Sequence, residues 1–225
     1  MRTDFFNRKI WRYIALSQGL AIVLLGFLVC ISLQMQPPSV GIVRNFCFLV
    51  SQESHIQAGT HEAQLNGGAG YLLSYQGREY VALSVYLKEE DAQRVISQLP
   101  EQEEVTLCIL TSPQLPGLDK EGGKESIRRQ ALDCLYGCMQ VLEQETARLD
   151  RGATQESSLQ IIETLIRQFR FLANKYIQTY SDFSKVCLQA KSFLEGCANP
   201  ILYVRDLRYL LCELAFSYVD LALNL

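Results

Sequence analysis

Residues 69–86 read AGYLLSYQGREYVALSVY, and this stretch decides the fold. Segments rich in tyrosine, leucine and valine flank Gln76 and Gly77, a pattern typical of two strands joined by a tight turn. We therefore predict a β-hairpin with strands at 69–75 and 78–86.

Working outward from the hairpin, each flank supplies one strand and one helix. Upstream, 45–51 is rich in aromatic and apolar residues and predicts a strand, and 54–66 predicts a helix that ends at Gly67 and Gly68. Downstream, 88–99 predicts a helix with three acids in its first turn, and 105–111 predicts the last strand. The predicted order is βαββαβ, which indicates an α+β domain over 45–112.

Helices in such a unit cover one face of the sheet, so alternation along the strands sorts residues by face. In the third strand we expect Val81, Leu83 and Val85 to form the core row. The opposite, open face would then carry a tyrosine-rich platform made of Tyr71, Tyr75, Tyr80, Ser84 and Tyr86. The alternative is that these tyrosines cover the sheet or meet the C-terminal region.

A family resemblance rests on three segments: Gly68-Ala69-Gly70-Tyr71, the run from Gln76 to Tyr86, and Lys88-Glu89-Glu90-Asp91-Ala92. Together they resemble the second half of a SPOR domain, and the match extends over 45–112. The resemblance implies a ferredoxin-like βαββαβ fold that binds peptidoglycan glycan strands stripped of stem peptides. It also implies a membrane-anchored protein of cell division or sporulation, with the glycan held on the open face of the sheet.

The resemblance places the glycan-binding residues at Ser51, Gln52, Tyr71, Tyr75, Tyr80, Ser84 and Tyr86. The first strand departs from the family, which has a Val-Gln-x-Gly-Ser-Phe-like run where this chain has Val50-Ser51-Gln52-Glu53-Ser54-His55. Gln52 is displaced by one position, which turns it to the other face unless a bulge intervenes. The alternative function is therefore a protein interaction scaffold at the cell envelope that has lost glycan binding.

The N-terminal segment predicts a membrane anchor. Residues 14–33 are apolar and uncharged, and a helix of about 20 residues crosses the roughly 30 Å hydrocarbon core. The basic residues Arg2, Arg8, Lys9 and Arg12 precede it, so we expect a cytoplasmic stub at 1–12, a single-pass span at 13–35 in the cell membrane, and extracytoplasmic domains. A cleaved signal peptide is the alternative, but no small-x-small cleavage site follows the run. Residues 36–44, with two consecutive prolines, predict a spacer.

The C-terminal part predicts an all-α helical bundle at 124–225, after a linker at 113–123. One amphipathic helix is expected at 124–149. A heptad-like seam then runs from Leu159 to Cys197 without a proline, which allows a single helix of about 60 Å. Asn199 and Pro200 would start a last helix ending near Leu223. The seam fits either an intramolecular antiparallel bundle or a surface for dimerisation or an envelope or division partner.

Composition and motifs exclude several functions. A net charge of -3 argues against a nucleic-acid partner. Seven of the eight cysteines follow the predicted span, and their helical spacing favours buried free thiols, with disulfides as the alternative. The only histidines are His55 and His61, and no nucleophile, metal spacing or phosphate loop accompanies them. We therefore predict a protein that is not an enzyme, without catalytic residues, cofactor or metal.

Overall fold

The computed structural model describes residues 41–51, 56–99, 105–115, 123–198 and 201–224. The predicted stub at 1–12, the predicted span at 13–35 and Gln52 lie outside these residues. Within them, no helix combines the length and the hydropathy that crossing a membrane requires. Gly41–Leu225 forms one compact unit, so a fragment beginning at Gly41 carries a whole core.

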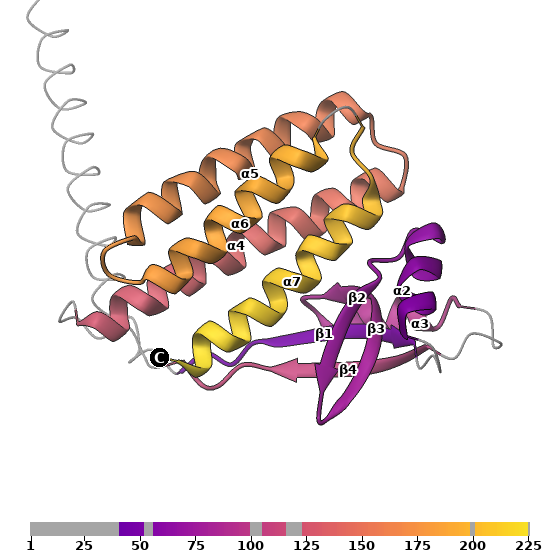
Figure 1. The fold of residues 1–225 in the computed structure, drawn as a ribbon, viewed down its shortest axis with the longest axis horizontal. Coiled ribbons are helices and arrows are strands. Elements are labelled where there is room, and N and C mark those ends of the chain that lie inside the picture. The colour runs from indigo at the N-terminus through magenta and orange to yellow at the C-terminus, as the bar shows by residue number, and fades with distance from the viewer. Residues whose placement is uncertain (1–40, 52–55, 100–104, 116–122, 199–200, 225) are drawn as a thin grey trace, which may run out of the picture. The chain divides into compact units, whose positions relative to one another are not determined.

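The first part of this unit is a four-stranded antiparallel sheet with two helices (Figure 1). Its elements follow the predicted order βαββαβ: β1 Asn45–Ser51, α2 Ile56–Leu65, β2 Tyr71–Tyr75, β3 Arg78–Tyr86, α3 Glu89–Ile96 and β4 Val105–Thr111. The strands lie in the order β2-β3-β1-β4, which puts β1 and β3 in the centre. The α+β class and the three strands β1, β3 and β4 are confirmed with their predicted bounds.

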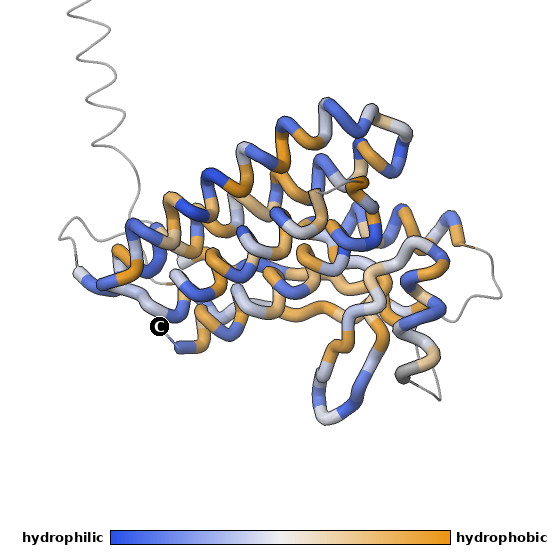
Figure 2. Tube along the Cα trace, turned by 45° about the horizontal axis from the view of Figure 1, so that its top comes forward, coloured by the Kyte–Doolittle hydropathy of each residue, from blue (hydrophilic) through white to orange (hydrophobic). Residues whose placement is uncertain are grey.

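The second part consists of four helices: α4 Lys124–Asp150, α5 Gln155–Tyr176, α6 Ser181–Cys197 and α7 Val204–Leu223. Polar and apolar segments alternate along each of them, as expected of helices with one buried side (Figure 2). The α5 and α6 helices pack against each other along their lengths, and α4 packs against α7.

The prediction that the heptad-like seam forms a single long helix is wrong. The chain reverses direction between α5 and α6, so the seam forms a helical hairpin. The amides of Thr179 and Tyr180 both donate to the carbonyl oxygen of Tyr176, at 3.1 and 2.7 Å, which closes the first helix. Phe183 then returns to Tyr176, with ring centroids 5.2 Å apart. Aromatic residues of the seam therefore pack within the hairpin, as in the intramolecular alternative.

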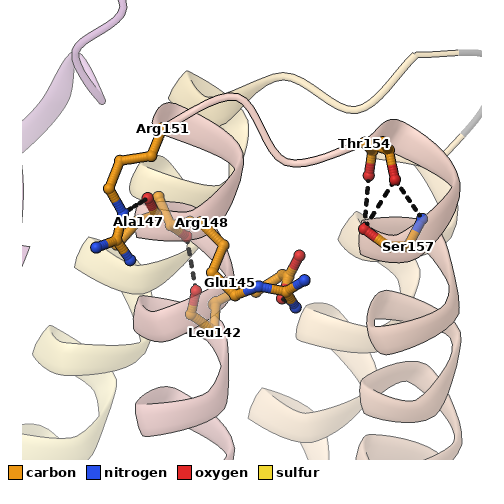
Figure 3. A network of polar contacts seen from close by, with 8 residues as sticks. Leu142, Glu145, Ala147, Arg148, Arg151, Thr154 and Ser157 are labelled. Atoms are coloured by element: carbon orange, nitrogen blue, oxygen red, sulfur yellow. Dashed lines mark hydrogen bonds and ion pairs between the residues drawn. The ribbon is translucent and has the colours of Figure 1, made fainter.

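Specific residues end α4 and start α5 at the turn between them (Figure 3). Gly152 has φ +90°, a left-handed conformation that favours glycine after a helix. Thr154 then caps α5 by accepting a hydrogen bond from the amide of Ser157 at 3.4 Å. In the last turns of α4, Arg148 pairs with the buried Glu145 at 2.7 Å.

The sheet and the helices share one continuous hydrophobic core. Phe46 and Phe48 of β1 are fully buried and belong to the same cluster as Leu132 of α4 and Tyr218 of α7. The rings of Phe46 and Tyr218 lie 5.2 Å apart. The parts that the sequence separates by a linker are thus joined through their interiors.

Arg44, just before β1, reinforces this junction. Its guanidinium donates to Asp133 of α4 at 2.8 Å and to the hydroxyl of Tyr218 at 3.1 Å. The backbone nearby is fixed as well, since the amide of Arg44 donates to the hydroxyl of Ser112 at 3.0 Å. One cation therefore ties the start of the sheet to two helices.

Candidate functional site: a cavity between α2, α3 and the sheet

A bulge in β3 decides which side chains share a face. Leu49 pairs with Ser84, whereas Val50 pairs with Ala82, so Leu83 is an extra residue in β3. An extra residue switches the alternation on its two sides. The single row predicted from Tyr80 to Tyr86 is therefore wrong.

We call the side of the sheet that packs against α7 and α4 the α7 face, and the side under α2 and α3 the α2–α3 face. The α7 face includes Phe46, Phe48, Leu73, Ala82 and Val85, which lie in the core shared with the helices. The α2–α3 face includes Cys47 and Leu49, which form a smaller core with Ala92 of α3. Helices cover both faces.

Three of the predicted glycan-binding residues, Tyr71, Tyr75 and Tyr80, lie half-buried on the α7 face and pack against the shared core. The ring of Tyr71 meets Tyr209 of α7 edge-on, with centroids 5.4 Å apart. Burial, with a smaller effect of the Glu213 carboxylate, raises the pKa of Tyr71 to about 12. The expectation of an open tyrosine platform is wrong, because α7 occupies that side of the sheet.

The hydroxyl of Tyr75 is also engaged. It donates to the carbonyl oxygen of Ile109 in the edge strand β4 at 3.4 Å and accepts from the side-chain amide of Gln76 at 3.1 Å. The alternative that these tyrosines cover the sheet or meet the C-terminal region describes their positions better than a platform does, since Tyr75 bonds within the sheet and Tyr71 meets α7.

The other three described residues of the predicted site, Ser51, Ser84 and Tyr86, come together on the α2–α3 face, where they line a cavity of about 530 Å³. Leu49, Leu83 and Val105 of the sheet also line it. Side chains of the two helices and the segments that follow them add Glu62, Ala63, Asn66, Val95 and Leu99. The predicted set is thus divided between the two faces.

Ser84 is the least exposed polar residue among the described residues that line the cavity, at 7%. In the part of the chain that the structure describes, no hydrogen bond joins the side chain of Ser84, Ser51 or Tyr86 to another residue. Solvent still reaches this hydroxyl, so it is free to bond water or a ligand in the cavity.

Charge enters the cavity only from Glu62 and Arg208 among its described lining residues. Glu62 is exposed. Arg208 of α7 is already paired, since it donates to the carbonyl oxygen of Gly67 at 2.7 Å and to Asp150 at 2.9 Å. Among the described lining residues, the ionic groups are thus one exposed carboxylate, that of Glu62, and one cation that is already paired.

The turn after α2 positions the part of the cavity lining that contains Gly68. Gly70 has φ +60°, and a Cβ built there would lie 2.4 Å from the carbonyl oxygen of Thr60. Only glycine fits such a close approach in this conformation. The turn brings Gly68 beside Leu83, at the end of the cavity that Arg208 reaches.

Sequence reasoning missed several lining residues, among them Ala63, Asn66 and Arg208. A signal existed for α2, where the buried positions Gly59 and Ala63 are four apart and too small to fill the space above a sheet. No sequence signal could place Arg208, because its partner Gly67 is 141 residues away.

The seven cysteines among the described residues are all free, and most are buried. For these residues, the expectation of free thiols rather than disulfides is confirmed. Burial raises the pKa of Cys47 and of Cys138 to about 11, so both thiols remain protonated near neutral pH and are poor nucleophiles. Across residues 41–224, outside the undescribed gaps, no three metal-ligating side chains gather.

Comparison with protein-family models, with curated proteins and with solved structures finds no match for this chain.

Proposed function

We propose that this protein is a non-enzymatic interaction scaffold of the cell envelope, anchored by residues 13–35, whose sheet does not bind glycan. The observation that carries the proposal is the position of α7. It lies along the face of the sheet on which SPOR domains, which 45–112 resembles, hold glycan strands. The βαββαβ order supports that resemblance in fold.

The energetics favour a permanently covered face. Five buried side chains of the sheet, Phe46, Phe48, Val50, Leu73 and Val85, belong to the core shared with the helices. Burying each contributes about 1.5–3 kcal/mol, so exposing all five costs roughly 8–15 kcal/mol. That is comparable with the whole free energy of unfolding of a domain, about 5–15 kcal/mol. A glycan strand that displaced the helices would have to supply a similar free energy.

The helical part supplies the surface that a scaffold needs. Phe171 of α5 is 59% exposed and Leu188 of α6 is 41% exposed. Both lie among polar and charged residues of the α5–α6 hairpin. An anchor would hold this hairpin beside the membrane and raise its effective concentration toward other envelope proteins.

Sedimentation with purified peptidoglycan, intact and stripped of stem peptides, tests the proposal. We expect the fragment 41–225 to stay in the supernatant with both preparations. An established glycan-binding SPOR domain serves as the positive control in the same tubes. Sedimentation of the fragment at a saturable, glycan-dependent level would overturn the scaffold proposal in favour of retained peptidoglycan binding.

A further inference from the structure

We propose that the cavity on the α2–α3 face is a binding site for an uncharged amphipathic small molecule, with an apolar body and a hydrogen-bonding oxygen. This site is independent of the scaffold function, since it lies on the face of the sheet opposite the one that α7 covers, although Arg208 of α7 reaches its edge. The inference rests on the space, on the hydroxyl of Ser84 and on the distribution of charge.

The space results from the residues of α2. Its inner positions Gly59 and Ala63 are buried but small, and the described parts of α2 and α3 make little direct contact with each other. Natural interiors are otherwise close-packed, with few voids larger than a water molecule. A cavity of about 530 Å³ lies in the range of sites that bind small molecules.

The hydroxyl of Ser84 offers an occupant of the cavity one polar contact. Ser84 lines the cavity and is 7% exposed, and its side chain has no hydrogen-bond partner among the described residues. A hydroxyl can donate one hydrogen bond and accept others, so a hydroxyl, carbonyl or ether oxygen of a ligand would satisfy it. Ser51 and Tyr86 bring two further hydroxyl groups to the same cavity.

The rest of the lining indicates an apolar body without net charge. Leu49, Leu83 and Val105 come from the sheet, and Val95 and Leu99 from the α3 side. A ligand that covers these side chains removes apolar surface from water. Among the described residues an anion would find no free cation, because Arg208 already holds Gly67 and Asp150. A cation would find only the exposed carboxylate of Glu62, which water screens, and a buried charge without a partner is strongly disfavoured.

Nile red, an uncharged fluorophore with a carbonyl oxygen, is the probe for the test, titrated with the fragment 41–225. We expect saturable binding that Ser84→Ala weakens about three- to tenfold, the effect of losing one hydrogen bond. Ser74→Ala makes the same change at an exposed site of β2 and should leave binding unchanged. Ala63→Leu, which fills the cavity, should weaken binding more than tenfold.

Competition tests the charge of the ligand. Monolaurin should displace Nile red at a concentration at least tenfold lower than laurate or dodecylammonium, which have similar chains and opposite charges. Thermal unfolding of each variant is measured in parallel, and Ser84→Ala remains informative if Ala63→Leu does not fold. Absence of saturable binding, equal binding by the wild type and Ser84→Ala, or equal displacement by the three competitors would overturn the proposal.

Discussion

The guanidinium carbon of Arg44 lies 3.6 Å from the centre of the Tyr136 ring. This cation–π contact adds to the ion pair with Asp133 on the same helix. The side chain of Arg44 is only 17% exposed, so the contacts are made with little competition from water. The start of β1 is therefore held to α4 by charge as well as by packing.

Arg44→Met should lower the free energy of unfolding by about 2 kcal/mol, because it removes a partly buried ion pair and a cation–π contact while keeping an apolar chain of similar length. Urea unfolding of the fragment 41–225 measures the change. Lys185→Met is the control, since Lys185 is 71% exposed and its pair with Asp182 should contribute no more than about 0.5 kcal/mol. Similar effects of the two substitutions would contradict the role given to Arg44.

Phe169 and Phe171 offer a matched pair two residues apart in α5. Phe169 is fully buried and Phe171 is 59% exposed. Phe169→Ala should cost about 3–5 kcal/mol by leaving a cavity in the core, whereas Phe171→Ala should change stability by less than about 0.5 kcal/mol. Chemical denaturation of both variants measures their free energies of unfolding. A Phe169→Ala variant as stable as the wild type would show that α5 packs differently.

Glu143 predicts a pH dependence of stability. Burial raises the pKa of its carboxyl group, although the amide of Leu87, which donates to it at 2.9 Å, acts in the opposite direction. The folded protein therefore binds this proton more tightly than the unfolded chain, and the contribution of Glu143 to stability falls as the pH rises above about 4.5.

Glu143→Gln removes this titration. The difference in unfolding free energy between the variant and the wild type should move in favour of the variant as the pH rises from 4 to 8. Urea unfolding at several pH values measures it. A difference that stays constant across this range would mean that the carboxyl group is not desolvated.

Cys134 should be the fastest thiol to react in the fragment 41–225. It is the exposed cysteine among the described residues, whereas Cys47, Cys138, Cys187 and Cys212 are buried. A disulfide reagent such as Ellman's should modify one thiol rapidly at pH 8, and Cys134→Ser should abolish that phase. Rapid modification of several thiols in the folded variant would contradict the packing of α4, α6 and α7.

The proposed anchor predicts the topology of the full chain. A reporter that is active only outside the cytoplasm should be active when fused after Leu225. Replacing Arg8, Lys9 and Arg12 with glutamate should weaken or scramble that orientation, because basic residues hold the N-terminus inside. Activity of a cytoplasm-only reporter at the same fusion point would overturn the anchor.

Local patterns were sufficient to predict most elements of the fold. Alternation and turn residues placed β1, β3 and β4, and helical spacing placed α4, because each signal is contained within its own segment. The break between α5 and α6 escaped prediction because the heptad-like spacing continues through it. Tyr180 keeps its place in the pattern although it lies outside both helices, with φ -153°.

The candidate site was harder to predict for two physical reasons. The extra residue Leu83 moves Ser84 and Tyr86 to the face opposite the predicted one. The apolar run around Leu83 contains no residue pattern that predicts a bulge. The cover over Tyr71 comes from Tyr209, 138 positions further along the chain, and one sequence gives no measure of such long-range packing. The sequence therefore singled out residues that line or cover the sheet, but it could not show which face each one lies on or what packs against it.

The central position of β1 has a mechanical consequence. Tension applied to the chain ahead of Gly41 enters the folded unit through this strand, which pairs with β3 on one side and β4 on the other. A pull along the strand loads both sets of hydrogen bonds in shear, so many must break together, and the lifetime under load is set by the unfolding rate. The amino end of the unit is thus a mechanically resistant point of attachment.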